Sequence, residues 1–451
     1  MNAARPGGPL SDPSELIGAA GEDERHHRLR ALVPGGCHTY AKGDDQYPAQ
    51  APAFIERGLG CHVWDLDGRE YIEYGMGLRA VTLGHAFEPV LQAVRRQLSS
   101  GTNFSRPAPI ELECAEQFLA LVPGADMVKF CKDGSDAVDG AVRLARAHTG
   151  RDMIAYCADH PFFSTGDWFI GTTEMNAGVP AATRSQVVGF RYNDLAGLEQ
   201  VFHSHPGRIA CVILEAARTD EPRGDYLQRV RELTRQHGAL LVFDEMITGF
   251  RWHLNGAQHV YGVTPDLSTW GKAMANGFSV SALAGRREIM SLGGSDRQRP
   301  RVFLLSTTHG AETHQLAAAI ATMRHYRDHP VVEGLYARGD RLRRGFGQVV
   351  AAHGLQGFVE LSSRDCNLLF VTRDGERRPS QAFRTLFMQE MLSHGIIAPS
   401  FVVSQAHSDE DLDRTVAAAD RALRVYRDAL DGGVERFLAG RQVKPVFRRL
   451  D

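Results

Sequence analysis

The feature that most constrains the fold is an alternation of short apolar runs with helical patterns, which begins near residue 88. Helical periodicity is expected over 110–122, 135–148 and 225–237, and the last of these ends at Gly238, a typical C-cap residue. The apolar runs between the helices cover residues 127–130, 154–156, 209–214 and 239–243. Short buried strands that alternate with helices are typical of a mainly parallel sheet covered on both faces. The sequence therefore predicts an α/β fold.

A second, smaller lobe is expected because 451 residues exceed the usual size of a single core. Short strands are expected at 53–57, 62–65 and 70–74. Later come a helix at 340–350, a strand at 367–372 and a helix that starts at Ser408 with a capping-box pattern. We expect residues 1–80 to form an N-terminal arm and small-domain strands, 81–330 a large domain, and 331–451 a C-terminal α+β small domain.

The overall composition excludes several classes of function. The formal net charge of −3 gives no general attraction to nucleic acid or to an anionic membrane. No stretch approaches the roughly 18 continuous apolar residues of a membrane helix, and the first residues lack the apolar segment of a secretory signal. The seven cysteines form no C-x-x-C pair, which favours reduced thiols in the cytoplasm over a metal cage. We expect a cytoplasmic protein without metal, nucleic-acid or membrane partners.

Two residues carry the chemistry that the sequence indicates most clearly. Asp244 ends an apolar run that is expected to be a buried strand, and Lys272 lies 28 residues later on a tight turn after Trp270. A carboxylate that stabilises a protonated pyridine nitrogen and an amine that forms an imine are what pyridoxal phosphate (PLP) needs from a protein. A surface lysine and a helix N-cap are the alternatives for the two residues taken singly.

The runs DEMITGFR at 244–251, YGVTPDL at 261–267 and Gly271-Lys272 resemble the class III PLP-dependent aminotransferases. Within this family the chain is most similar to the glutamate-1-semialdehyde 2,1-aminomutase branch, from about Pro34 to about Tyr426. The resemblance implies PLP transferase fold type I, in which a large domain with a mainly parallel sheet accompanies a small α+β domain. It also implies that Lys272 holds PLP and moves protons, while Asp244 pairs with the pyridine nitrogen.

The resemblance implies further cofactor contacts. Gly134 and Ser135 stand where the family binds the phosphate, at the start of a helix whose N–H groups suit an anion. Phe162 or its neighbour Phe163 stands where an aromatic ring stacks on the pyridine, with Phe162 preferred. The other implied contacts are Met246 on the opposite ring face, Glu215 near the phenolic oxygen, and Thr308 or Thr307 on the phosphate of a neighbouring subunit. A homodimer with active sites at its interface is therefore expected.

The substrate side departs from the family pattern. Lys42 replaces an arginine that would clamp a carboxylate, and this exchange is not conservative at a two-pronged site. Leu78 replaces a pocket-lining tryptophan, and the C-terminal segment at 400–407 is shorter and lacks the family glutamate. The residues predicted to contact the substrate are His38, Thr39, Tyr40, Lys42 and Arg79, although His38, Lys42 and Arg79 could equally be ordinary surface groups.

These departures predict an aminotransferase that moves an amino group from an amino acid, such as glutamate or glutamine, to a carbonyl acceptor. An oxo-sugar or an aminoglycoside or aminocyclitol intermediate is the predicted acceptor, partly by analogy with similar chains. Two alternatives use the same residues: an intramolecular aminomutase of the glutamate-1-semialdehyde type, and a PLP-dependent epimerase on an amino sugar. A catalytically silent protein with the PLP fold is a fourth reading, which the presence of Lys272 disfavours.

Overall fold

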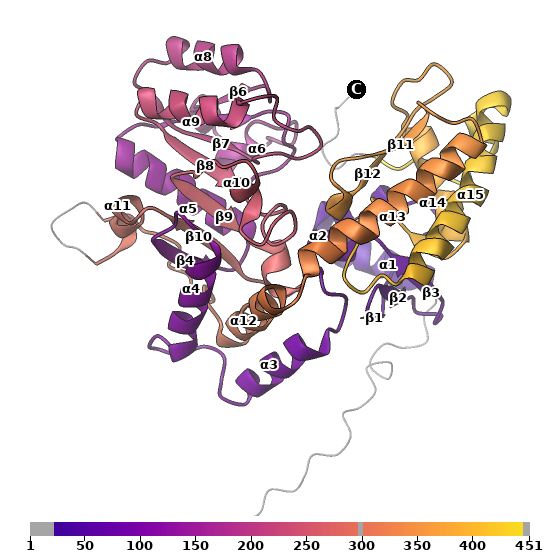
Figure 1. The fold of residues 1–451 in the computed structure, drawn as a ribbon, viewed down its shortest axis with the longest axis horizontal. Helices are drawn as coiled ribbons and strands as arrows, with labels where there is room; N and C mark the ends of the chain where they lie inside the picture. Colours follow the sequence, from indigo (N-terminus) through magenta and orange to yellow (C-terminus); the bar gives the residue numbers. More distant parts are fainter. Residues whose placement is uncertain (1–21, 296–300, 445–451) are drawn as a thin grey trace, which may run out of the picture.

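The chain folds into two lobes joined by long helices (Figure 1). A computed structural model describes residues 22–295 and 301–444, so the first 21 residues of the expected N-terminal arm lie outside the described part. The larger lobe contains a seven-stranded sheet of order β4-β10-β9-β8-β7-β5-β6. All neighbouring pairs from β9 to β6 are parallel, and β10 runs antiparallel to both β4 and β9. The predicted mainly parallel sheet is confirmed.

The strands of the large sheet are short, and β4, β5, β7 and β8 follow the predicted apolar runs closely, whereas β6, β9 and β10 were not predicted. Their bounds are β4 Met127–Cys131, β5 Met153–Cys157, β6 Val187–Phe190, β7 Ile209–Leu214, β8 Leu240–Asp244, β9 Leu267–Trp270 and β10 Ser281–Gly285. Every residue of β7, β8, β9 and β10 is buried. Continuous burial explains why β7, and β8 up to Asp244, are apolar throughout rather than alternating.

Alternate residues of the central strands face two different cores. Ile213 and Val242 belong to a cluster with the apolar face of α5, whereas Val212 and Leu241 pack with residues of α9. This division follows from the two-residue period of a strand.

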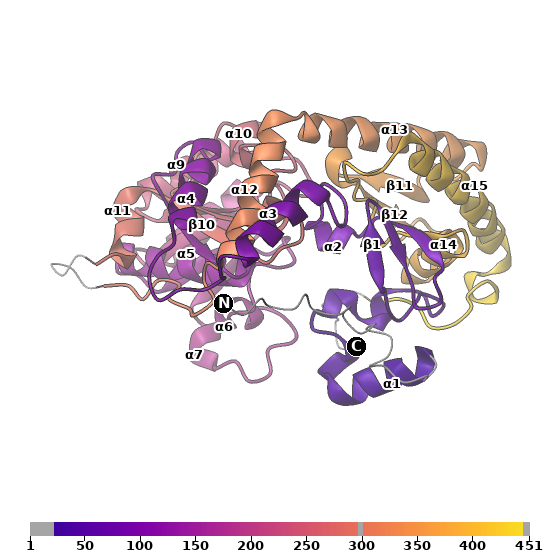
Figure 2. The same cartoon turned by 90° about the horizontal axis from the view of Figure 1, so that it is seen from below.

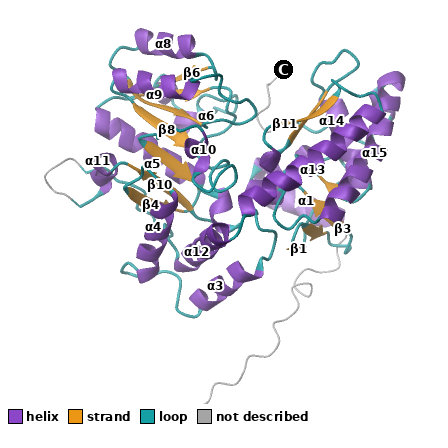
Figure 3. Cartoon of the chain, in the orientation of Figure 1, coloured by secondary structure: helices purple, strands orange, loops and turns teal. Residues whose placement is uncertain are grey.

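The helices are α1 Glu22–Leu32, α2 Met76–Arg79, α3 Glu88–Leu98, α4 Pro109–Leu121, α5 Gly134–Thr149, α6 Asp167–Ile170, α7 Ala181–Arg184, α8 Leu195–Ser204, α9 Tyr226–Gln236, α10 Gly256–Val260, α11 Arg287–Met290, α12 Thr313–Asp328, α13 Val331–Ala352, α14 Gln381–Ser393 and α15 Asp409–Gly432. Figure 3 shows helices of the large lobe on both sides of its sheet.

The smaller lobe combines strands from both ends of the described chain. Its four-stranded sheet has the order β1-β2-β3-β13, with β1 Arg57–Leu59, β2 His62–Trp64, β3 Glu70–Glu73 and β13 Ile396–Ile397. β13 pairs in parallel with β3, and a separate hairpin joins β11 Val359–Ser362 to β12 Leu369–Thr372. We propose domain boundaries near residues 80 and 330 because this pairing groups the N-terminal strands with the C-terminal segment.

Three predicted elements of the smaller lobe differ from the structure. The strand expected at 53–57 begins only at Arg57, which follows the donor-free Pro52 by five residues. The helix expected at 340–350 is the second half of the longer α13, and the strand expected at 367–372 begins at Leu369 because a 3-10 turn, Asp365–Asn367, precedes it. The capping box of α15 is present, since the Ser408 side chain accepts from Asp411 N while Ser408 N donates to the Asp411 carboxylate.

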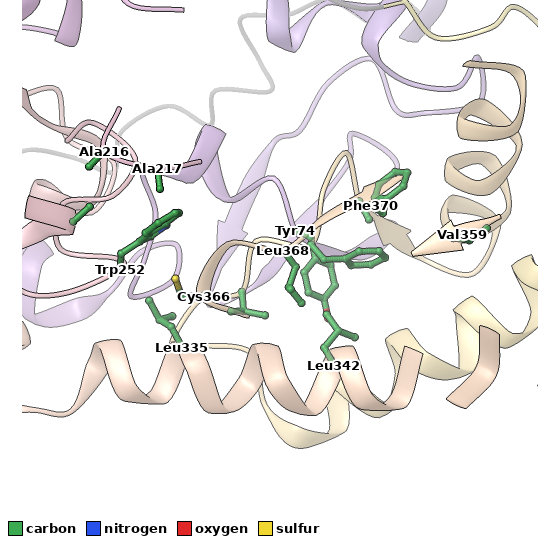
Figure 4. Close-up of a cluster of buried hydrophobic side chains, with 14 of the residues drawn as sticks. Tyr74, Ala216, Ala217, Trp252, Leu335, Leu342, Val359, Cys366, Leu368 and Phe370 are labelled. Atoms are coloured by element: carbon green, nitrogen blue, oxygen red, sulfur yellow. The ribbon is translucent and has the colours of Figure 1, made fainter. Parts of the chain in front are cut away.

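A shared apolar cluster connects the lobes. Ala216, Ala217 and Trp252 from the large lobe belong to the same buried cluster as Leu335 and Cys366 (Figure 4). Beside it lies the fully buried Arg251, whose guanidinium donates to the carbonyls of Cys366 (3.1 Å) and Val403 (3.0 Å) and to Thr82 Oγ1 (2.9 Å). Arg251 therefore holds three separate chain segments against the large lobe.

Replacing Arg251 with alanine should destabilise the protein strongly. The substitution leaves two buried carbonyl groups and a buried hydroxyl without their donor, and each such loss costs about 1–3 kcal/mol. We expect a loss of roughly 3 kcal/mol or more in the free energy of unfolding, measured from urea denaturation. Arg235→Ala, on the exposed side of α9, is the matched control and should change stability by less than about 0.5 kcal/mol. Equal midpoints for the two variants would show that Arg251 does not join the lobes.

Candidate active site

The sequence-predicted residues gather where the strands of the large sheet end. Asp244 is the last residue of β8, Glu215 follows β7 directly, and Lys272 follows β9 after one glycine. β7, β8 and β9 are parallel neighbours, so their carboxyl ends lie along one edge of the sheet. β4 has the same direction because it is antiparallel to β10, which is antiparallel to β9. Gly134 and Ser135, which follow β4, therefore start their helix at the same edge, the usual binding edge of an open α/β sheet.

Asp244 is buried, and only one of its two carboxylate oxygens accepts hydrogen bonds from described residues. Its Oδ1 accepts from Met246 N (2.9 Å) and from Thr269 Oγ1 (3.1 Å), and among the described residues Oδ2 has no hydrogen bond. Burial raises the pKa of this carboxyl, and nearby Lys272 opposes that rise. The free oxygen is available to a protonated ring nitrogen.

Lys272 sits at the start of a short 3-10 turn, Lys272–Ala275, with a φ of 39°. A positive φ is uncommon for a residue with a side chain and marks local strain of the kind found at functional sites. Burial lowers the pKa of Lys272, whereas the nearby carboxylates of Asp244 and Glu215 raise it. The net lowering favours the neutral amine, which is the form that attacks an aldehyde.

Glu215 is only 3% exposed, and its Oε2 is buried without a hydrogen-bond partner among the described residues. Its Oε1 lies 4.0 Å from Nη1 of Arg218. Burial raises the pKa of Glu215 to about 7, although Arg218, Lys272 and Arg79 act to lower it. This orphaned polar atom, next to an amine and a second carboxylate, fits a site that is completed by a bound polar group.

The pKa of Glu215 predicts a pH-dependent effect of Glu215→Gln. Glu215 has a pKa of 4.5 in the unfolded chain and of about 7 in the folded protein, so between these pH values only the folded protein holds the proton. The stability that this group contributes therefore falls as the pH rises from 4.5 to about 7. Glutamine has no such loss. From about pH 5 to about pH 9, the cofactor-free variant should gain up to roughly 3 kcal/mol relative to the unsubstituted protein. Urea denaturation at several pH values measures it, with exposed Glu116→Gln as the control. A constant difference across this range would contradict the predicted pKa.

The start of α5 forms a close-packed cradle suited to a phosphate. A Cβ added at Gly134 would lie 2.9 Å from Met246 Sδ, and one added at Gly271 would lie 2.8 Å from the same sulfur. Met246 therefore lies between the start of α5 and the turn that carries Lys272. Ser135 Oγ accepts from Thr165 N (3.1 Å), and the Asp133 side chain caps the helix through Asp136 N. A 16-residue helix with free N–H groups at this edge suits a dianion, so the residues present fit PLP.

Three aromatic rings near the predicted stacking position, those of Phe162, Phe163 and His160, have different environments. Phe162 is 43% exposed and makes an edge contact with Phe169, whereas Phe163 is buried in the core below the sheet edge. His160 is buried, and its Nδ1 accepts from Glu215 N (3.0 Å). Burial and the charge of Arg218 lower the pKa of His160 to about 3, so its ring is neutral. Stacking by Phe162 stays a prediction, and His160 is a further ring at this edge.

Thr308 lies in an exposed segment, and its carbonyl accepts from Asn103 Nδ2 (3.0 Å). Thr307 is also exposed, so the structure does not choose between them. Glu312, four residues later, forms an ion pair with Lys132 just before the start of α5. The segment is thereby tied to the phosphate end of the site within one subunit, and its reach into a neighbouring subunit stays a prediction.

The predicted substrate residues fall into two groups. His38, Thr39 and Tyr40 are exposed on the segment that follows α1, on the small-lobe side of the molecule (Figure 2). Lys42, at the end of the 3-10 turn Tyr40–Lys42, lines a cavity of about 810 Å³ together with Leu78. Arg79 is separate from these: it lies within electrostatic range of Lys272 and Glu215.

Two residues of this edge were not predicted from the sequence. Arg218 lies on the loop after β7, and His160 lies on the loop after the adjacent β5. A signal was available for both, because each is a polar residue within four positions of the end of a predicted strand.

Comparisons with known proteins identify the family of the chain. The family model for class III aminotransferases matches residues 43–356. Glutamate-1-semialdehyde 2,1-aminomutase of Persephonella marina is 32% identical over 392 residues, which cover 82% of this chain and 90% of that protein. The enzyme of the same name from Roseiflexus castenholzii is 33% identical, with 90% and 97% covered.

Solved structures share the same fold. A PLP form of the FumI protein of Sphingopyxis sp. MTA144 is 29% identical with a TM-score of 0.83, covering 91% of this chain and 97% of that one. An omega-transaminase from Sphaerobacter thermophilus is 26% identical with a TM-score of 0.80, covering 92% and 100%. The predicted fold class and family resemblance are confirmed, and the chain belongs to the class III aminotransferases, enzymes that use pyridoxal phosphate as their cofactor.

Proposed function

We propose that this enzyme transfers an amino group from an amino acid donor to the carbonyl group of a polyhydroxylated acceptor, an oxo-sugar or an aminoglycoside or aminocyclitol intermediate. The observation that carries the proposal is that Lys42 and Leu78 line one cavity of about 810 Å³ on the small-lobe side, and that α2, which carries Leu78, also contacts the turn Lys272–Ala275. Lys42 and Leu78 replace the arginine and tryptophan expected in the aminomutase branch. Arg69, Glu73 and His85 line the same cavity. A wall with this many hydrogen-bonding groups suits a substrate with several hydroxyl groups.

The chemistry of the site is divided between a few side chains. PLP, when bound, supplies an electron sink for the carbanion formed at the substrate carbon. Asp244 offers its free Oδ2 to the protonated ring nitrogen and keeps that nitrogen charged. Lys272, in its neutral form, removes the proton from the substrate carbon and delivers it to C4′ of the cofactor. The N-terminus of α5 holds the phosphate through Gly134 and Ser135.

We also propose a homodimer, in which Thr308 of each subunit reaches the phosphate of the other. The exposure of Thr307 and Thr308 on a segment tied to Lys132 supports it. Mixed dimers of Lys272→Ala and Thr308→Ala subunits test it, because one of the two sites in a mixed dimer would keep both residues. Recovery of activity on mixing is expected, and no recovery from exchanging subunits would contradict it. The seven free cysteines, six of them buried, support a reducing, cytoplasmic location.

An intramolecular aminomutase is the second candidate, because the relatives named glutamate-1-semialdehyde 2,1-aminomutase cover more than four fifths of this chain. The discriminating experiment converts the enzyme to its pyridoxamine form and offers carbonyl acceptors one at a time. Recovery of the aldehyde-form absorbance with oxo-sugars, faster than with glutamate semialdehyde, is expected. Preference for glutamate semialdehyde, with turnover that needs no external donor, would replace the proposal by the aminomutase.

A further inference from the structure

Two arginines approach the catalytic edge from different lobes. Arg79 ends α2, a turn in which Met76, Leu78 and Arg79 all have positive φ values of 44°, 57° and 75°. Three such residues in one turn are a strained arrangement that the surrounding structure must hold in place. Arg218 comes from the loop after β7, and its carbonyl accepts from Ser363 Oγ (2.9 Å) in the smaller lobe. Both backbones are anchored where the lobes meet.

Their charged ends share one environment. The positive charges of Arg79 and Arg218 both act on Lys272 and on Glu215, and Arg218 also acts on Arg79. Burial, followed by the charges of Arg218 and Arg251, lowers the pKa of Arg79 to about 10. The two guanidinium groups therefore lie within electrostatic range of each other and of the catalytic amine, and Arg218 Nη1 is 4.0 Å from Glu215 Oε1.

Most of their hydrogen-bond donors have no partner among the described residues. Arg79 uses Nε to bind Asn367 Oδ1 (2.9 Å), and no hydrogen bond of its terminal nitrogens occurs within the described chain. The guanidinium of Arg218 forms no hydrogen bond to a described residue, and its nearest carboxylate oxygen, on Glu215, is 4.0 Å away. Its side chain is 25% exposed, so an incoming group can reach it. Paired guanidinium groups with free forked donors match the two oxygens of a carboxylate.

The charge balance also calls for an anion. Among the charges that act on Glu215, those of Asp244 and Lys272 offset each other, which leaves the two guanidinium groups of Arg79 and Arg218 and Glu215 itself. Because the pKa of Glu215 is about 7, this carboxyl neutralises at most one of them. A bound carboxylate would restore neutrality in a partly buried site where an unpaired charge is costly.

We propose that Arg79 and Arg218 together bind the carboxylate of a reactant beside Lys272. The inference rests on the proposed function and deepens it, since this pair would take over the role of the family arginine that Lys42 replaces. Binding there places the carbon next to the carboxylate within reach of the Lys272 amine. The amino donor is the expected source of the carboxylate, and the acceptor is the other source.

Succinate, an unreactive dicarboxylate, is the direct probe. Its affinity for the PLP-loaded enzyme is measured by titration calorimetry in the unsubstituted protein, Arg218→Gln, Arg218→Lys and Arg79→Gln. We expect Arg218→Gln and Arg79→Gln to weaken binding about 10- to 100-fold, as charge-assisted hydrogen bonds imply, with a smaller loss for Arg218→Lys. Arg223→Gln is the matched control, because Arg223 is exposed on the same loop and its hydrogen bonds to described residues involve only its backbone N–H and carbonyl. Unchanged affinity in Arg218→Gln would overturn the proposal, even if Arg79→Gln fails to fold.

The two half-reactions identify the source of the carboxylate. If the donor supplies it, Arg218→Gln raises the donor concentration needed for half-maximal conversion to the pyridoxamine form, and 1-phenylethylamine, which lacks a carboxylate, is affected far less. If the acceptor supplies it, the deficit appears only in the return half-reaction. A further outcome is that the enzyme binds succinate in a way that depends on Arg218 and yet transfers no amino group to any oxo-sugar. This result would contradict the proposed acceptor and support the carboxylate site. Amino transfer to an oxo-sugar, together with succinate binding that does not depend on Arg218, would support the proposed acceptor and contradict the carboxylate site.

Discussion

Lys272→Ala is expected to lower the rate of amino transfer by about 10⁴-fold or more, since it removes both the imine-forming amine and the base that moves the proton. The neighbouring Asp244 and Glu215 cannot replace it, because a carboxylate forms no imine with an aldehyde. Binding of the cofactor should become non-covalent, because its phosphate and ring contacts are retained. The measurement is single-turnover conversion of the PLP form to the pyridoxamine form with an amino acid donor.

The control is Lys129→Ala, which removes an exposed lysine of the same domain. Its rate should equal that of the unsubstituted enzyme. Retention of more than about one tenth of the rate in Lys272→Ala would mean that another group moves the proton, and it would remove the basis of the catalytic assignment.

Asp244→Asn is expected to weaken PLP binding and to slow the proton-transfer step. Asparagine keeps an oxygen that accepts from Met246 N and Thr269 Oγ1, so the local fold should persist while the charge is lost. Removing one charge of a buried pair costs about 2–5 kcal/mol, which corresponds to roughly 30- to 5000-fold in cofactor affinity. Titration of the cofactor-free protein with PLP measures this loss.

The rate of the donor half-reaction gives an independent reading of Asp244. With the cofactor at saturation the variant should still be slow, because an uncharged partner no longer keeps the ring nitrogen protonated. Asp152→Asn, at an exposed position, should leave both quantities unchanged. A normal rate in the saturated Asp244→Asn enzyme would show that the carboxylate does not face the ring nitrogen.

Local signals made much of the fold predictable. The bounds of α5 and α9 and the start of α15 agree with expectation to within two residues, because capping residues and a one-sided apolar face mark them. The buried strands β7 and β8 were found because burial on both faces leaves continuous apolar runs, whereas β9 and β10, which contain serine, threonine and glycine, were not. The strand predicted at 53–57 was misplaced, because β1 begins only at Arg57. The position of a short edge strand is set by its partner, here β2, rather than by its own sequence pattern.

The site was predictable only in part, for a related reason. Lys272 and Asp244 belong to a linear pattern, so sequence alone could pair them. Arg218 and Arg79 are brought together by the meeting of the loop after β7 with the small lobe, more than 130 positions apart in sequence. No local periodicity records such a contact. The segment at 38–42 shows the opposite case. Its residues were assigned to the substrate by their position in a sequence pattern, and in the structure most of them are exposed.

The most direct test of the central claim is chemical. Borohydride reduction of the PLP-loaded enzyme, followed by peptide mapping, shows which lysine carries the cofactor. The chain offers only five candidates, at positions 42, 129, 132, 272 and 444. The structure predicts a stable pyridoxyl group on Lys272 alone, with none on the Lys272→Ala variant. Modification of any other lysine at equal yield, or no modification at 272, would contradict the assignment of the active site.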